Sequence, residues 1–89
     1  MDKETYKIVY NAIEKYDPIG IAYFTENEYE PEAIDITNRC CVLSEEDLYQ
    51  YTKDVFEFWF GKNLSANKDD IYRYIAREIK SKLDEGKEA

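Results

Sequence analysis

The chain lacks histidine, and its 89 residues include three glycines and two prolines. Histidine is the commonest general base near neutral pH and a frequent metal ligand, so its absence excludes Ser–His and Cys–His nucleophile pairs and histidine-bound metals. The glycines, Gly20, Gly61 and Gly86, are isolated from one another, which excludes a glycine-rich phosphate-binding loop. These absences remove most classes of enzyme, and we expect a non-catalytic protein that uses no cofactor and no metal.

Long apolar runs are also missing. No segment approaches the roughly 20 apolar residues that a membrane span requires, and the sequence begins with charged residues rather than an apolar signal core. We therefore expect a cytoplasmic protein. Its two cysteines, Cys40 and Cys41, are adjacent, where a disulfide would be strained and would close no useful loop. We expect both to be reduced thiols that face the core.

Negative charge is in excess. The chain has 20 acidic and 12 basic residues, for a formal net charge of −8, so its average field repels phosphate backbones and anionic membranes. Residues 1–62 hold 14 acidic and 6 basic residues, whereas residues 63–89 hold 6 of each. We expect no binding to nucleic acid or membrane. A hydrophobic fraction of 44% with 16% aromatic residues suffices for the core of one domain over residues 1–89.

Apolar residues recur at three- and four-residue intervals in four segments, which predicts four amphipathic helices. The expected helices cover residues 3–16, 31–39, 45–60 and 68–85, and Gly86 is expected to end the last one. The sequence thus predicts an all-α, compact four-helix bundle-like domain with one long packed loop between the first and second helices. The third helix has the widest apolar face, so we expect it to lie at the centre.

The helix ends carry recognisable signals. Asp2 and Asn67 are expected N-caps, and Ser44 with Asp47 forms a variant capping box. Pro18 should stop the first helix, because proline disfavours helical geometry in the preceding residue. The irregular residues 18–29 that follow are expected to form the packed loop. A short strand is the alternative, but a lone strand with no partner cannot form a sheet.

Glu26, Glu28, Glu30 and Glu32 alternate along the chain, a spacing similar to that of a calcium-binding loop. Such a loop prefers short Asp or Asn side chains and a glycine at its sixth position, where this sequence has Pro31. A solvated acidic face, a divalent-metal site and a partner-binding surface all remain open for this run.

Two tyrosines lie among these acids, and no lysine or arginine occurs between Lys15 and Arg39. Tyrosine gives a large contact area at a small entropic cost, and clustered carboxylates attract a basic partner. The candidate partner-binding residues are Tyr23, Glu26, Glu28, Tyr29, Glu30, Glu32 and Asp35. The alternative is that the tyrosines belong to the core and that the acids stabilise the start of the second helix.

Residues 16–20, Tyr-Asp-Pro-Ile-Gly, followed by Asn-Glu-Tyr at residues 27–29 and a short helix, resemble the YugE-like family, a domain-of-unknown-function group of small acidic bacterial proteins. The resemblance extends over most of the chain and implies a compact helical fold and a bacterial cytoplasmic origin. The family brings no established activity, so it implies no functional residues. Small acidic helical proteins also include bacterial immunity proteins that neutralise basic nuclease toxins, which is an analogy of fold alone.

The leading hypothesis is a non-catalytic protein-binding module that engages a basic protein through its acidic, tyrosine-bearing surface, with an immunity or antitoxin protein as one form of it. A metal sensor or metal-dependent enzyme that uses the four alternating glutamates is the first alternative. A self-associating structural domain is the second, because the aromatic face of the third helix is wide. The oligomeric state is not predicted.

Overall fold

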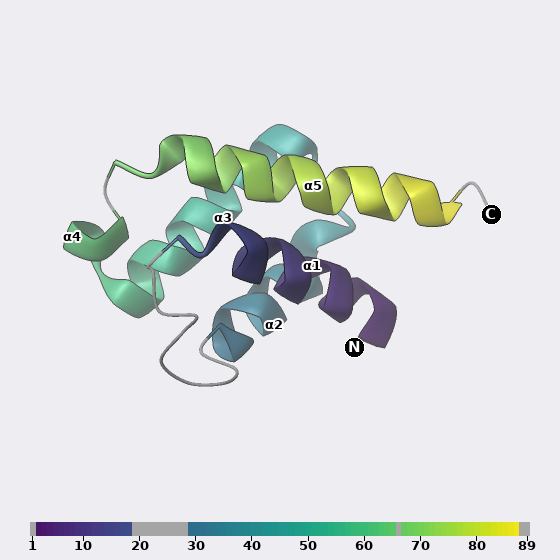
Figure 1. The fold of residues 1–89 in the computed structure, drawn as a ribbon, viewed down its shortest axis with the longest axis horizontal. Helices are drawn as coiled ribbons and strands as arrows, with labels where there is room; N and C mark the ends of the chain where they lie inside the picture. The colour runs from purple at the N-terminus through teal and green to yellow at the C-terminus, as the bar shows by residue number, and fades with distance from the viewer. Residues whose placement is uncertain (1, 19–28, 66, 88–89) are drawn as a thin grey trace.

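Four long helices and one single-turn helix make up the protein in its computed structural model, which describes residues 2–18, 29–65 and 67–87 (Figure 1). They are α1 (Lys3–Tyr16), α2 (Glu30–Cys40), α3 (Glu45–Phe60), α4 (Lys62–Ser65) and α5 (Asp69–Lys87). The predicted compact all-α domain of four packed helices is confirmed. The expected packed loop, and the strand considered in its place, fall mainly on residues 19–28 and lie outside the described residues.

The ends of α1 agree with the sequence prediction. The Asp2 carboxylate accepts a hydrogen bond from the backbone N–H of Glu4 at 3.1 Å, and the hydroxyl of Thr5 donates to it at 2.6 Å. The first bond satisfies a backbone donor that the first helical turn leaves without a partner, and the second fixes the orientation of the capping carboxylate. At the other end, Asp17 adopts a left-handed conformation with φ of 45° immediately before Pro18. Aspartate tolerates this region better than most residues, so α1 stops where proline was expected to stop it.

Helix α3 begins with the Ser44 half of the predicted capping box. The Ser44 hydroxyl accepts a hydrogen bond from the backbone N–H of Asp47 at 3.1 Å. The helix closes at Gly61, which has φ of 85° and whose N–H donates to the carbonyl of Glu57 at 2.8 Å. A residue with a Cβ atom would be strained at that φ, so the glycine defines this end of α3.

The sequence prediction missed one helix and misplaced two helix ends. The helix α4 was not expected, because a single turn is too short to show amphipathic periodicity. Asn67 has φ of 64° and lies two residues before α5, so it is not the residue that directly precedes the helix. Gly86 lies inside α5 rather than ending it. Glycine in a helix is only about 1 kcal/mol less favourable than alanine, so a long helix can contain one near its end.

All four long helices contribute to one core. Helix α5 packs against both α1 and α3, and α2 also packs against these two helices. Figure 1 shows α1 and α5 side by side and running in opposite directions. The buried apolar residues are Val9, Ala12, Ile13, Tyr29, Ala33, Ile36, Cys40, Leu48, Val55, Phe56, Tyr72, Ile75, Ala76 and Ile79. Within the described residues, no helix combines the length and apolarity that crossing a membrane requires.

The two cysteines have different environments. Cys40 is buried as expected, and burial together with the neighbouring Cys41 raises the pKa of its thiol to about 12. Such a thiol is poorly nucleophilic at neutral pH. Cys41 follows the last residue of α2 and is exposed, so the prediction that both thiols face the core is wrong for Cys41. The chain leaves the helix at this point, and the helical periodicity no longer determines where the side chain points.

Aromatic rings form the centre of the core. The ring of Phe56 on α3 lies 5.5 Å from that of Tyr72 on α5, 5.9 Å from that of Tyr29 and 5.7 Å from that of Phe60, measured between centroids. Pairs at these separations contribute about 0.5–1.5 kcal/mol beyond the area that they bury. Phe56 therefore joins the start of α2 to α3 and α5.

Tyr29 has a second function in the fold. Its ring is fully buried, and its hydroxyl donates a hydrogen bond to the carboxylate of Asp17. Asp17 follows the last residue of α1 and Tyr29 precedes the first residue of α2. This bond therefore connects the end of α1 to the start of α2, across the segment that separates the two helices in sequence.

We expect Tyr29→Phe to lower the free energy of unfolding by about 1–3 kcal/mol, because it removes a hydrogen bond to a carboxyl group and keeps the ring packing. Urea denaturation measures the change. Tyr74→Phe is the matched control, since Tyr74 is half exposed, and its effect should stay within about 0.5 kcal/mol. Equal stabilities of the two variants would show that the Tyr29 hydroxyl does not stabilise the fold.

Candidate functional site

The candidate partner-binding residues divide into three groups. Tyr23, Glu26 and Glu28 lie outside the described residues. Tyr29 and Glu32 are buried, with exposed fractions of 0% and 2%, so their side chains do not lie on an accessible surface. Glu30 is exposed and Asp35 is half-buried. Among the described candidates, only Glu30 and Asp35 are therefore placed to meet a partner.

Glu32 is a buried acid in the first turn of α2. One of its carboxylate oxygens, Oε2, has no hydrogen-bond partner among the described residues. Burial raises the pKa of this carboxyl group, and the negative charge of Asp35 raises it further, while the backbone N–H of Glu32 itself opposes the shift. Removing a carboxylate from water without a full set of partners is unfavourable, so burial destabilises the charged form of Glu32 relative to its form in water.

We expect Glu32→Gln to stabilise the protein at pH 7 by on the order of 1 kcal/mol, or roughly 4–8 °C in Tm, because it removes a buried charge. Since the folded-state pKa lies above the ordinary value of 4.5, the stability that Glu32 contributes is complete below pH 4.5 and is lost as the pH rises through the folded-state pKa. The advantage of the variant should therefore vanish at low pH.

Thermal unfolding as a function of pH measures this difference. Glu30→Gln is the control, because Glu30 lies in the same helical turn and is exposed. A stability difference between wild type and Glu32→Gln that does not change with pH would contradict the assignment of a raised pKa to Glu32.

Asp35 is part of a contact between α2 and α3. The indole Nε1–H of Trp59 donates to Oδ2 of Asp35 at 2.9 Å, and the Tyr51 hydroxyl donates to the Asp35 carbonyl oxygen at 3.3 Å. The guanidinium of Arg39 lies 5.5 Å from the centre of the Tyr51 ring, within the range of a cation–π contact. These interactions fix the position of the Asp35 carboxylate beside the end of α3.

Two aromatic side chains project from α3 beside this carboxylate. Phe58 is 78% exposed and Trp59 is 45% exposed, and their rings meet edge to face at 5.4 Å. Asp54 lies one helical turn before Phe58 and is also exposed, with Gln50 donating to its carboxylate at 3.1 Å. We call the set Asp35, Tyr51, Asp54, Phe58 and Trp59 the aromatic–acidic surface.

Of these five residues, only Asp35 was among the candidates predicted from the sequence, and the exposed Phe58 was missed. The wide apolar face of α3 could have indicated this exposed residue. A helix in a small bundle cannot bury aromatic residues around most of its circumference. Val55 and Phe56 are buried and mark the side of α3 that faces the core, whereas Phe58 is exposed. An apolar face wider than its neighbours can cover indicates exposed aromatic residues at one of its edges.

The residues considered for a metal are not brought together as a site in the described part of the chain. Of the four alternating glutamates, Glu30 and Glu32 are described, and one is exposed while the other is buried. Among the described residues, no group of three or more Asp, Glu or Cys side chains is arranged to hold a metal ion.

No protein-family model matches the chain, and no solved structure is similar to it. The resemblance to the YugE-like family therefore stays a prediction. The geometry of the aromatic–acidic surface is the basis for a functional assignment.

Proposed function

We propose that this protein is a non-catalytic, cytoplasmic binding module that docks a basic protein on its aromatic–acidic surface. The exposure of Phe58 and Trp59 beside the Asp35 carboxylate supports this proposal most directly. An immunity or antitoxin protein, which neutralises a basic toxin, is one form that such a module takes.

Trp59 has the properties of an interface anchor. Tryptophan is enriched among the residues that dominate binding energy, and exposed aromatic pairs are typical of interaction sites. The hydrogen bond to Asp35 holds the indole in one orientation before any partner arrives. Less rotational freedom is then lost on binding, which favours affinity.

The acidic residues of the surface supply selectivity. Oδ2 of Asp35 accepts from Trp59, while its other carboxylate oxygen has no hydrogen-bond partner among the described residues and is available to a lysine or arginine. Asp54 adds a second exposed carboxylate, and Arg39 is the cation beside them. With a net charge of −8, the chain attracts a basic protein from a distance and at a rate that falls with salt.

Affinity capture from lysate of the source organism, followed by binding measurements with the purified partner, tests the proposal. We expect a basic partner whose affinity falls at least about tenfold for Trp59→Ala and about as much for Phe58→Ala. Tyr74→Ala is the matched control, because Tyr74 is an exposed aromatic residue outside this surface, and it should bind as wild type does.

Salt provides the second part of this test. Asp35→Asn keeps an oxygen that accepts from Trp59 but removes the charge, so it should make binding weaker and less sensitive to salt. An acidic partner, or one whose affinity is the same for Trp59→Ala and Tyr74→Ala, would contradict the proposed function.

The same exposed aromatic pair favours a second candidate, self-association through Phe58 and Trp59. Sedimentation at increasing concentration distinguishes the two. A dimer that Phe58→Ala dissociates would support self-association, and a monomer at all concentrations would exclude it.

A further inference from the structure

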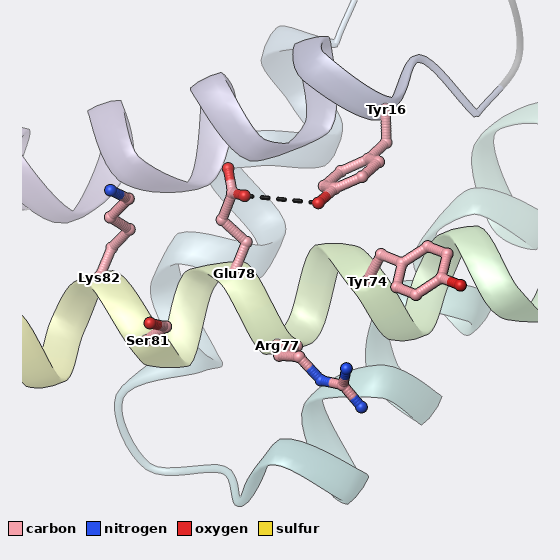
Figure 2. Close-up of a pocket in the computed structure, with 6 residues that line it drawn as sticks. All are labelled: Tyr16, Tyr74, Arg77, Glu78, Ser81 and Lys82. Carbon is pink, nitrogen blue, oxygen red and sulfur yellow. Dashed lines mark hydrogen bonds between the residues drawn. The ribbon is translucent and has the colours of Figure 1, made fainter.

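A groove separate from the aromatic–acidic surface lies where α1 and α5 run side by side (Figure 2). It has a volume of about 390 Å³ and is open to solvent. One lining residue comes from the end of α1 and five come from α5: Tyr16, Tyr74, Arg77, Glu78, Ser81 and Lys82. None of them has a role in the proposed protein-binding function.

One end of the groove is aromatic. The rings of Tyr16 and Tyr74 stack with centroids 5.9 Å apart and planes 27° apart. Tyr74 is 48% exposed, so part of its ring is accessible to a ligand. An accessible tyrosine ring stabilises a stacked planar group by about 1–3 kcal/mol.

The rest of the groove is positive in character. Among the described residues, Glu78 is the one carboxylate that lines it, and its Oε1 accepts from Lys15 Nζ at 2.8 Å and from the Tyr16 hydroxyl at 3.4 Å. Figure 2 shows Glu78 directed toward Tyr16 and α1. The negative charge of Glu78 is thus offset by Lys15, a residue that does not line the groove.

The two cations that line the groove are more available to a ligand than Glu78 is. Arg77 forms no ion pair with any carboxylate in the described part of the chain. Lys82 pairs with Glu85 at 3.6 Å, but both side chains are more than half exposed, and such pairs contribute little. In Figure 2, Arg77 and Lys82 extend to opposite sides of α5, with Ser81 between them. An anion above Ser81 would meet the hydroxyl donor of Ser81, with Arg77 one helical turn away on the same stripe of α5.

The spacing along α5 restricts the ligand. Seven residues separate Tyr74 from Ser81, which corresponds to two helical turns and about 10 Å. A ligand that reaches both ends must therefore carry its aromatic ring and its anionic group on opposite ends of a spacer. A phosphate bonded directly to a ring, as in phenyl phosphate, is too short, whereas the ribose of a nucleotide provides the required length.

We propose that this groove binds a nucleoside monophosphate, with the base stacked on Tyr74 and the phosphate held by Arg77 and Ser81. The ribose hydroxyls would lie near the Glu78 carboxylate and the Tyr16 hydroxyl oxygen, both of which accept hydrogen bonds. The site uses both phosphate and base, so neither part alone should bind well.

NMR titration of the full chain tests this with AMP as the probe, and with adenosine, inorganic phosphate and phenyl phosphate as partial ligands. AMP should shift the amide signals around residues 74–82 and bind at least about tenfold more tightly than each partial ligand. Residue-resolved detection separates this site from stacking on Trp59.

Matched variants separate the contribution of the aromatic end of the groove to AMP affinity from that of the phosphate end. Arg77→Gln should weaken AMP binding about tenfold and leave adenosine unchanged, whereas Tyr74→Ala should weaken both. Lys62→Gln makes the same charge change at an exposed residue of α4 and should bind AMP as wild type does. The proposal is overturned by the absence of shifts at millimolar AMP, by shifts located elsewhere, by equal binding of AMP and adenosine, or by equal effects of Arg77→Gln and Lys62→Gln.

Discussion

The packing of Phe56 against Tyr29, Phe60 and Tyr72 is the interaction on which the arrangement of this small domain depends. It also determines which aromatic residues remain outside. Side chains two residues apart on a helix point in nearly opposite directions, because each residue turns the helix by about 100°. Burial of Phe56 therefore directs Phe58 to solvent, and burial of Tyr72 directs Tyr74 toward the groove. The exposure of Phe58 in one candidate site and of Tyr74 in the other thus follows from the same central stack.

Much of this fold is predictable from the sequence because its helices carry strong local signals. Helix α1 has the predicted bounds, and its cap at Asp2 and its stop before Pro18 are both local effects within a few residues. The errors arise where local signals are weak or tertiary packing decides. The helix α4 is a single turn, Gly86 is retained within a long helix, and Cys41 lies beyond the end of α2, where periodicity no longer applies.

The candidate site was less predictable, since a sequence shows which residues are acidic or aromatic but not which of them are covered. Tyr29 and Glu32 were grouped with their acidic neighbours as one binding surface, yet both are buried, and the tyrosine belongs to the core. Asp35 was identified, but its partner Trp59 is 24 residues away and on another helix. Only the packing of α2 against α3 brings the carboxylate and the indole together, so no spacing rule along the chain would have found the pair.

The aromatic–acidic surface is locally negative and the groove between α1 and α5 is locally positive. Both can occur on one chain with a net negative charge. Fields between exposed charges are screened over roughly 8 Å at physiological salt, whereas the molecule measures 39 × 27 × 19 Å. The immediate neighbours of a site therefore outweigh the net charge of −8. Lys15 offsets Glu78 in the groove, while Asp35 and Asp54 outnumber Arg39 on the aromatic–acidic surface. The distribution of charge along the sequence also favours opposite local charges. The acidic excess lies within residues 1–62, whereas five of the six groove residues come from residues 63–89, which hold equal numbers of acidic and basic residues.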